Sequence, residues 1–195
     1  MRKRRLMPPT IDPKLAWKLV SSRYVSRDPW FTVRRDCLDL PNGKRIQRYH
    51  VLEYPDWVSV IALTPEEKMV LVQQYRHGIG KISFELTAGV CEKSDSSYLE
   101  AARRELLEET GYGGGEWSLY TVLSANPATH SNLSYTYLAR NVTPVAEPSL
   151  DEGEVLSAHL FEKKEVLELL RRNEICQSLM AAPLWKYFCE YGTGE

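Results

Sequence analysis

Three glutamates, at positions 105, 108 and 109, have the spacing in this chain that points most directly to chemistry. On a helix with about 100° per residue, Glu105, Glu108 and Glu109 fall on one face within a single turn. Carboxylates this close repel one another, but a hard divalent cation reverses the sign because Mg²⁺ prefers oxygen ligands. Mg²⁺ usually takes one or two carboxylates and completes its shell with water and phosphate oxygens. The cluster therefore predicts a metal ion and a phosphate-bearing substrate.

The same segment has a plainer interpretation. Arg104 lies four residues from both Glu100 and Glu108, a spacing at which ion pairs form along a helix. The segment would then be a salt-bridged face exposed to solvent, and composition alone favours that interpretation. The order of the surrounding residues is what favours a metal site.

A helix over about 97–110 is expected to carry the cluster. Ser and Asp residues before it offer capping oxygens, and Gly111 offers a stop. Leu99, Ala102 and Leu106 recur at helical spacing and supply a stripe for burial. The sequence thus predicts a helix that is apolar on one side and carboxylate-rich on another.

Strand-forming runs dominate the first two thirds of the chain. Runs at 30–40 and about 44–53 are joined by Pro41-Asn42-Gly43, which predicts a β-hairpin. Further strands are expected at 58–63, 69–74, 117–124, 133–140 and 155–161, and helices at 163–172 and 175–190. This order predicts an α+β fold with a mixed sheet. The segment 141–153 is expected to be a long loop of the kind that often carries function.

Composition narrows the class of protein. The chain has 195 residues, 43% of them hydrophobic, with a net charge of −1. This is expected of a globular domain and argues against broad attraction to nucleic acid or membranes. Four cysteines form no Cys-x-x-Cys pair, and neither a secretory signal nor a membrane span is evident, so a cytoplasmic protein is expected. We expect a flexible tail at 1–13, which includes the basic run 2–5, then a β subdomain at 14–55 and a main domain at 56–195.

The stretch from Gly89 to Tyr112 resembles the Nudix box. That pattern reads Gly, five residues, Glu, seven residues, Arg-Glu-aliphatic, one residue, Glu-Glu, one residue, Gly, aliphatic. The run from Arg104 to Gly111 agrees with its second half at eight consecutive positions. The resemblance extends over about 17–190 to the ADP-ribose pyrophosphatase branch. It implies a mixed β-sheet between helices, with an N-terminal antiparallel β-hairpin subdomain that forms a homodimer.

The first half of the box departs from the pattern in two ways. Fourteen residues separate Gly89 from Arg104 where thirteen are expected. The position of the first Glu holds Asp95 when counted forward from Gly89, and Ser96 when counted back from Arg104. In the family that Glu mainly braces the loop and the box arginine, and Asp95 could brace them with a shorter arm.

The resemblance also assigns roles to the carboxylates. Glu105 and Glu109 would be the principal ligands of Mg²⁺, or of Mn²⁺, with Glu108 assisting and the carbonyl of Ala88 adding a ligand. The resemblance also makes Arg104 and Glu108, on the same helix, candidate catalytic residues.

A carboxylate base is expected from the loop at 151–154. Glu154 aligns best and Glu152 is the second candidate, although acidic loop residues are usually only solvated. A water that attacks phosphorus benefits from such a base and from a metal ion.

Substrate contacts follow from the same resemblance. Arg76 would bind phosphate, since a guanidinium fork suits a diphosphate, but it could also be a surface strand-end arginine. Trp30 would stack on adenine or, alternatively, pack beneath the hairpin. Glu85 would lie near the ribose. Ser131 and Asn132 resemble the branch's substrate-side loop, whereas His130 is not expected to be catalytic.

The expected reaction is hydrolysis of the pyrophosphate bond of a nucleoside diphosphate linked to a sugar, with ADP-ribose giving AMP and ribose 5-phosphate. Two alternatives remain open. One is another nucleotide sugar such as GDP-mannose, because base stacking discriminates poorly. The other is a Nudix module that binds a nucleotide without turnover, which the altered first half of the box favours and the intact second half disfavours.

Overall fold

The structure is a computed structural model that describes residues 11–194, and these form two units. The first unit runs to Tyr54 and also contains Ala128–Ser131. The second comprises Pro55–Pro127 and the residues from Asn132 onward. Most of the tail predicted at 1–13 lies outside the described residues.

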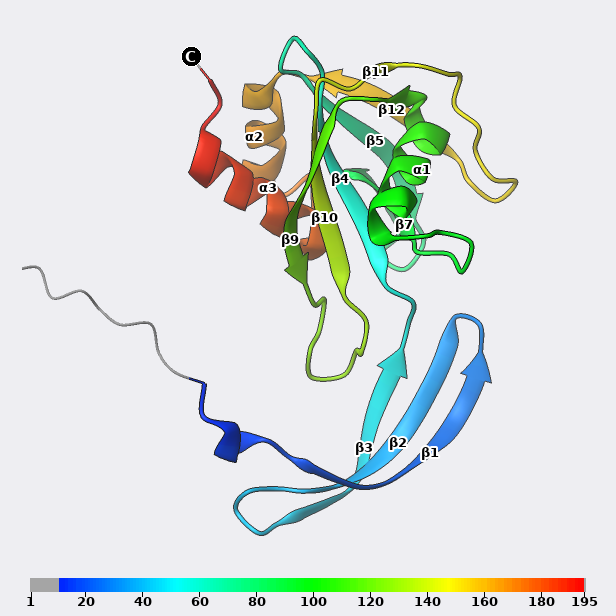
Figure 1. The fold of residues 1–195 in the computed structure, drawn as a ribbon, viewed down its shortest axis with the longest axis vertical. Helices are drawn as coiled ribbons and strands as arrows, with labels where there is room; N and C mark the ends of the chain where they lie inside the picture. Colours follow the sequence, from blue (N-terminus) through cyan, green and yellow to red (C-terminus); the bar gives the residue numbers. More distant parts are fainter. Residues whose placement is uncertain (1–10, 195) are drawn as a thin grey trace, which may run out of the picture. The chain divides into compact units, whose positions relative to one another are not determined.

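The N-terminal unit is an antiparallel sheet in the order β1-β2-β3 (Figure 1). A short 3₁₀ helix, Pro13–Leu15, precedes β1 (Lys18–Asp28), β2 (Phe31–Asp39) and β3 (Arg45–Glu53). The predicted hairpin is confirmed as β2 and β3, and its turn contains Gly43 at φ +80°, a conformation that favours glycine. The preceding strand β1 was not predicted, because both of its faces are largely exposed and its sequence does not alternate.

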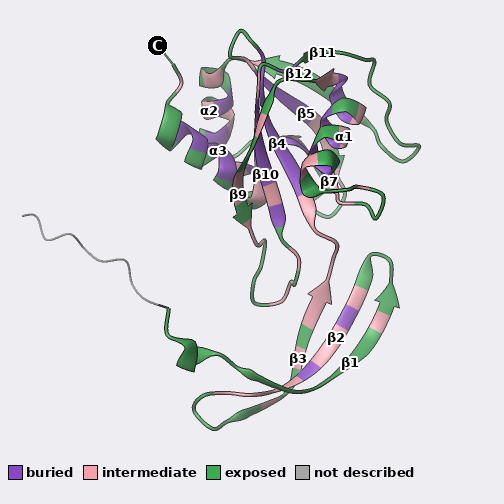
Figure 2. Ribbon diagram, in the orientation of Figure 1, coloured by how far each residue is buried: buried purple, intermediate pink, exposed green. Residues whose placement is uncertain are grey.

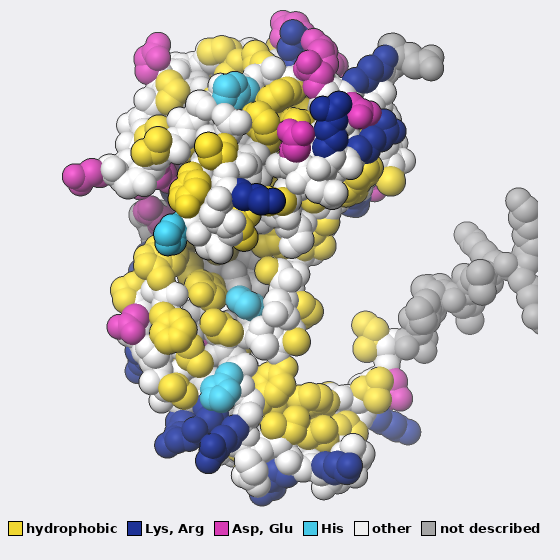
Figure 3. All heavy atoms as spheres, turned by 180° about the vertical axis from the view of Figure 1, so that it is seen from behind, with side chains coloured by type: hydrophobic (Ala, Val, Ile, Leu, Met, Phe, Trp, Pro, Cys, Tyr) yellow, Lys and Arg dark blue, Asp and Glu magenta, His cyan; other side chains and the backbone are white. Residues whose placement is uncertain are grey.

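Very little of this unit is buried (Figure 2). Among its described residues only Val33 and Asp36 are buried. Asp36 accepts hydrogen bonds from Arg34 Nε at 3.0 Å and Ser22 Oγ at 2.6 Å. Large hydrophobic side chains lie at its surface instead, and hydrophobic atoms are widespread in the space-filling view (Figure 3). They include Leu19, Val25 and Phe31 and others on β1 and around the β1–β2 turn.

The second unit is built on a mixed sheet in the order β12-β5-β4-β10-β9, with β6 paired to β5 and β7 to β4. Parallel pairing of β4 with β10 makes the sheet mixed, as predicted. Its strands are β4 (Trp57–Leu63), β5 (Met69–Arg76), β6 (Lys81–Glu85), β7 (Thr87–Val90), β9 (Glu116–Leu123), β10 (Ser134–Arg140) and β12 (Leu156–Phe161). A separate small ladder joins β8 (Tyr112–Gly113) to β11 (Thr143–Pro144), and β11 lies in the segment 141–153 that was expected to be a long loop.

Three helices cover the two faces of the sheet: α1 (Tyr98–Thr110) one face, and α2 (Lys163–Arg171) and α3 (Ser178–Tyr191) the other (Figure 1). Alternate residues of β4 serve the two layers, as the strand period requires. Val60 belongs to the cluster that contains Leu106 of α1, whereas Ile61 belongs to the cluster that contains Leu184 of α3. No helix within residues 11–194 is long and apolar enough to cross a membrane. The predicted α+β fold, a mixed sheet between helices preceded by an antiparallel hairpin, is confirmed.

Candidate active site

Helix α1 begins and ends where its sequence predicts. Ser97 is the N-cap, and its Oγ accepts a hydrogen bond from the backbone N–H of Glu100 at 3.2 Å. Gly111 closes the helix at φ +73°, in the left-handed region. Leu106 is fully buried toward the sheet. These contacts fix the rotation of α1 about its axis and therefore the direction of its carboxylates.

The three glutamates are not equivalent in the structure. Glu105 and Glu109 are buried, with residue exposures of 7% and 3%. The side chain of Glu108 is 41% exposed. Glu105 and Glu109 therefore face β7, while Glu108 lies at the margin of the same group.

Strand β7 comes close to the helix because it carries a glycine. A Cβ atom at Gly89 would lie 2.1 Å from Glu105 Oε1, so any other residue would displace that carboxylate. The neighbouring Ala88 donates its backbone N–H to Glu109 Oε2 at 3.3 Å. The structure thus brings Ala88 to the predicted carboxylates through its amide, and a role for its carbonyl as a ligand stays a prediction.

Burial dominates the electrostatics of the pair. Burial, with the charge of the Glu105 carboxylate as the second cause, raises the pKa of Glu109 to about 9. Burial likewise raises the pKa of Glu105 to about 7, against the opposing effect of Arg104. The Glu154 carboxylate contributes to the raised pKa of both groups. Two buried carboxylates whose pKa values stay raised despite the nearby arginines form a site in which a cation would be stabilised.

The donor set fits a hard cation that keeps part of its own shell. Within residues 11–194, no three His, Cys, Asp or Glu side chains are already gathered around one point as a ready-made ion cage. Mg²⁺ does not need such a cage, since it commonly binds through one or two carboxylates plus water and phosphate oxygens. Glu105 and Glu109 satisfy that requirement, and all of their donor atoms are oxygens.

Arg104 is the centre of a network of ion pairs. Its Nη1 donates to Glu105 Oε1 at 2.9 Å and to Glu108 Oε2 at 3.0 Å. Its Nε and Nη2 donate to the two oxygens of Asp95, at 3.1 and 3.0 Å. Nη2 also reaches the carbonyl oxygen of Val90 at 3.1 Å. Of the two pairings expected for Arg104 on the helix, the one with Glu108 is present, whereas Glu100 pairs with Arg103 instead.

Arg76 and Glu85 form a second pair beside the helix carboxylates. Arg76 Nε lies 3.0 Å from Glu85 Oε1, and Nη2 lies 2.6 Å from Oε2. Glu85 is 1% exposed, while the Arg76 side chain is 33% exposed. The hydrogen bonds that Arg76 donates to Glu85 raise the pKa of Arg76, and the charges of Glu109 and Glu154 add to that effect. A cation at the end of β5 is thus oriented by a buried carboxylate, and its role in binding phosphate stays a prediction.

The loop that leads to β12 brings Glu154 toward this group. Its backbone N–H donates to Asp151 O at 2.9 Å, and its Oε2 accepts from Asp151 N at 3.3 Å. The loop is joined to the end of α1 by Ser149 N–H, which donates to Glu108 O at 2.8 Å. Both Glu154 and the second candidate, Glu152, are exposed. Only Glu154 contributes to the raised pKa values of the buried pair.

Two of the remaining predicted substrate residues belong to the N-terminal unit and one to the second unit. Trp30 is in the β1–β2 turn of the N-terminal unit and is 61% exposed, so it does not pack beneath the hairpin. Ser131 also belongs to the N-terminal unit and donates its N–H to Leu52 O at 3.1 Å. Asn132 belongs to the second unit and donates Nδ2 to Pro55 O at 3.0 Å. Its Oδ1 is buried without a hydrogen-bond partner among the described residues.

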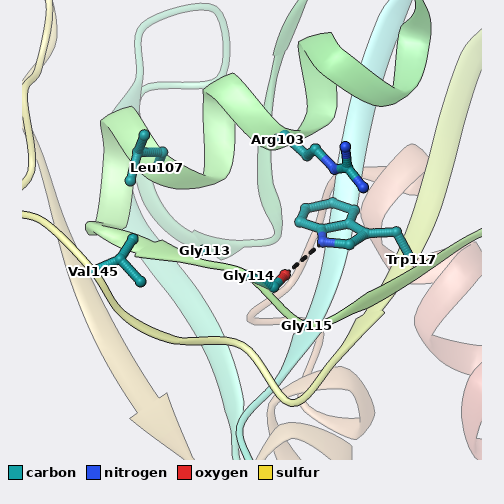
Figure 4. A pocket seen from close by; sticks show the side chains of 7 residues that line it. All are labelled: Arg103, Leu107, Gly113, Gly114, Gly115, Trp117 and Val145. Atoms are coloured by element: carbon teal, nitrogen blue, oxygen red, sulfur yellow. Dashed lines mark hydrogen bonds between the residues drawn. The ribbon is translucent and has the colours of Figure 1, made fainter.

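A pocket of about 320 Å³ lies on the other side of α1 (Figure 4). Arg103 and Leu107 from the helix line it, with Trp117 from β9 and the Gly113–Gly115 backbone. The Arg103 guanidinium lies 5.8 Å from the Trp117 ring centroid, and Trp117 Nε1 donates to Gly114 O at 2.7 Å. This pocket contains none of the predicted carboxylates, and we do not assign the chemistry to it.

Two contributors were not named as site residues from the sequence. Gly89 appeared only as the start of the box, although its place before a carboxylate helix signals a close approach. Asp56, which follows the hairpin, accepts hydrogen bonds from Tyr98 Oη at 2.7 Å and Leu133 N at 2.8 Å. It thereby ties the first turn of α1 to the start of β10.

Comparison with known proteins covers most of the chain. Residues 53–180 match the model of the NUDIX domain, and residues 17–52 match the nucleoside diphosphate sugar hydrolase N-terminal domain. The chain is 30% identical to an ADP-ribose pyrophosphatase of Bacillus subtilis, over 71% of this chain and 74% of that protein. It is 31% identical to the methanol dehydrogenase activator of Bacillus methanolicus, over 73% and 77% of the two chains. A crystal structure of an ADP compounds hydrolase superposes with a TM-score of 0.73 at 23% identity, covering 91% of this chain and 96% of the other.

Proposed function

The chain belongs to the Nudix hydrolase family, and on that premise we propose that it hydrolyses the pyrophosphate bond of a nucleoside diphosphate linked to a sugar. The proposed substrate is ADP-ribose, with AMP and ribose 5-phosphate as products. The observation that carries the proposal is the buried pair Glu105 and Glu109, whose pKa values are raised by burial next to the cation Arg76. A site of this kind suits a divalent cation together with the oxygens of a diphosphate.

Mg²⁺, with Mn²⁺ as a substitute, is the proposed cofactor. Glu105 and Glu109 would hold it, with Glu108 and the Ala88 carbonyl as further ligands. When bound, such an ion neutralises phosphate charge and lowers the pKa of coordinated water.

The chain's own residues supply the rest of the proposed mechanism. Arg76, held by Glu85, presents a guanidinium to the diphosphate and offsets its charge. Glu154 accepts a proton from the attacking water, and Glu152 is the second candidate for that role. Arg104 keeps Glu105 and Glu108 in place through the hydrogen bonds that it donates to both.

A homodimer formed through the N-terminal unit is part of the proposal. The exposed hydrophobic side chains on β1, among them Leu19, Val20 and Val25, support it, because a three-stranded sheet with so little buried apolar surface gains from a partner. We also propose a cytoplasmic location, which the four free cysteines support, since such compartments keep thiols reduced.

Two other functions have a specific observation in their favour. GDP-mannose or another nucleotide sugar is supported by the match of residues 17–52 to the nucleoside diphosphate sugar hydrolase N-terminal domain. A binding module without turnover is supported by Arg104, which already neutralises Glu105 and Glu108 in the structure.

One assay separates these functions. Mg²⁺-dependent release of phosphomonoesters is measured with ADP-ribose, GDP-mannose and NADH, for the wild type and for Glu109→Gln. The proposal expects fastest turnover of ADP-ribose and its loss in the variant. Faster turnover of GDP-mannose would replace the substrate, and tight ligand binding without products at high Mg²⁺ or Mn²⁺ would establish the binding module.

A further inference from the structure

The loop between β7 and α1 departs from the family pattern in both length and residue type, and the two departures meet at one contact. Of the two residues that could stand for the first Glu, Asp95 is the one that binds Arg104, and it follows Gly89 at the expected interval. The extra residue is therefore assigned to the segment between Asp95 and Arg104. Helix α1 starts at Tyr98 with Ser97 as its cap, which places the extra residue in the short link before the helix. The added length is therefore in the segment that sets how far Asp95 lies from Arg104.

Asp95 is bound on both sides. Its two oxygens face the Nε and Nη2 edge of Arg104 at 3.1 and 3.0 Å, and its side chain is only 8% exposed. Oδ2 also accepts the backbone N–H of Glu92 at 2.8 Å, while Asp95 N–H donates to Glu92 O at 3.2 Å. The reciprocal bonds close a tight turn, and a carboxylate one carbon–carbon bond longer, about 1.5 Å, does not fit both partners without moving the loop.

Arg104 transmits this position to the proposed metal ligands. While Asp95 holds one edge of the guanidinium, Nη1 holds Glu105 at 2.9 Å and Glu108 at 3.0 Å. A planar guanidinium cannot turn one edge without turning the other, so the loop sets the direction of both carboxylates. Partners of this kind outside the ligand set typically affect metal affinity or activity by about 10–100-fold.

We propose that Asp95 and the extra loop residue are a matched pair, in which the longer loop compensates for the shorter acid, and that Asp95 is a positioning residue for Glu105 and Glu108 through Arg104. This inference rests on the proposed function of the same helix. From the family pattern, which has Glu at this position, one would expect Asp95→Glu to improve the site. The matched pair predicts the opposite: Asp95→Glu alone impairs it. Shortening the loop at the same time repairs it.

The test uses the full chain with Asp95→Asn, Asp95→Glu, and Asp95→Glu combined with deletion of Ser96, which leaves the Ser97 cap in place. Glu100→Gln is the matched control, since Glu100 also pairs with an arginine of α1, at 2.8 Å, but on the exposed side. The readouts are Mn²⁺ affinity by electron paramagnetic resonance in the absence of substrate, the Mg²⁺ concentration for half-maximal turnover of ADP-ribose, and the melting temperature.

We expect Asp95→Asn to weaken Mn²⁺ binding and raise the Mg²⁺ requirement by about tenfold. Asp95→Glu should weaken Mn²⁺ binding and raise the Mg²⁺ requirement, each at least threefold. The variant that also lacks Ser96 should return to within twofold of the wild type in both. Glu100→Gln should change neither. If Asp95→Glu matches or exceeds the wild type, or if the deletion does not improve it while both melt at similar temperatures, the matched pair is wrong. An inactive wild type that still binds Mn²⁺ with this order of affinities would refute the proposed reaction and leave the positioning role supported.

Discussion

The two sides of α1 carry the same residue types in different surroundings. On the exposed side, Glu100 and Arg103 pair at 2.8 Å, and both side chains are 47% exposed. On the side toward β7, Arg104 binds Glu105 and Asp95, whose side chains are 10% and 8% exposed. The two arginines are neighbours in sequence, yet only one is enclosed by carboxylates and backbone.

The contrast shows that the exposed side of α1 is a salt-bridged face, whereas the side toward β7 has the buried carboxylates that the proposed metal site requires. An exposed pair at i,i+3 or i,i+4 contributes only about 0.3–0.5 kcal/mol, because water screens it. A carboxylate in a buried group has a pKa that depends on its neighbours, so it can respond to a metal or a substrate. Changes on the enclosed side should therefore affect activity, and changes on the exposed side should affect little.

The largest expected effect is that of Glu109→Gln. Loss of a buried carboxylate ligand should lower kcat with ADP-ribose about a thousandfold, which corresponds to several kcal/mol of lost stabilisation. The matched change on the exposed side, Glu100→Gln, should leave kcat within twofold. Steady-state kinetics at saturating Mg²⁺ measures both, and an equal loss in the two variants would remove the distinction between the sides.

Gly89→Ala should have the next largest effect. The new Cβ would lie 2.1 Å from Glu105 Oε1, so the carboxylate must move. A displacement of about 1 Å at a reacting centre can cost about a hundredfold in rate. Gly78→Ala is the control, because a Cβ at Gly78 meets nothing within 4 Å. Activity of Gly89→Ala equal to that of Gly78→Ala would show that Glu105 is free to move.

Glu109, on the side of α1 toward β7, should also determine how the free energy of unfolding depends on pH when no metal is bound. The pKa of Glu109 is raised from 4.5 to about 9 in the folded protein, so the folded state binds this proton more tightly than the unfolded state. The stabilisation of the folded state by protonated Glu109 is fully present below pH 4.5 and is lost as the pH rises toward 9. Urea unfolding in EDTA should show the wild type losing stability relative to Glu109→Gln over this range, by at most about 1.4 kcal/mol per pH unit. Added Mg²⁺ should reduce the loss, and parallel pH profiles of the two proteins would contradict the raised pKa.

The smallest effect is expected for Arg103→Gln on the exposed side. Breaking its pair with Glu100 should lower the free energy of unfolding by about 0.5 kcal/mol or less. High salt should lessen the difference, since the pair is exposed. Chemical denaturation at two salt concentrations measures this, and a loss of several kcal/mol would show that the exposed side is structurally coupled to the site.

The elements whose ends carry local sequence signals could be predicted from the sequence. The ends of α1 follow from the Ser97 cap and Gly111, and the β2–β3 hairpin follows from its Asn-Gly turn. Strand β1 has no such pattern, because neither of its faces is buried in this chain. It can be located only through its pairing with β2, a non-local property.

The site was predictable to a similar degree. Helical periodicity placed Glu105 and Glu109 on one face, but burial of the two depends on β7, whose close approach requires Gly89. The spacing could not predict which glutamate pairs with Arg104, since Glu100 and Glu108 each lie four residues from it in the sequence. In the structure Arg104 pairs with Glu108 and with Asp95, because the loop before α1 places Asp95 next to the arginine.

The four residues Ala128–Ser131 belong with the N-terminal unit although they lie far along the chain. Leu52 N–H donates to Thr129 O at 2.7 Å, and Ser131 Oγ reaches Leu52 O across 79 positions of sequence. Closing a loop of that length costs chain entropy before any contact compensates it, so we expect these bonds to form late in folding. A fragment that ends at Tyr54 would lack the segment that pairs with its last strand. The two units therefore cannot be obtained intact by a single cut in the chain.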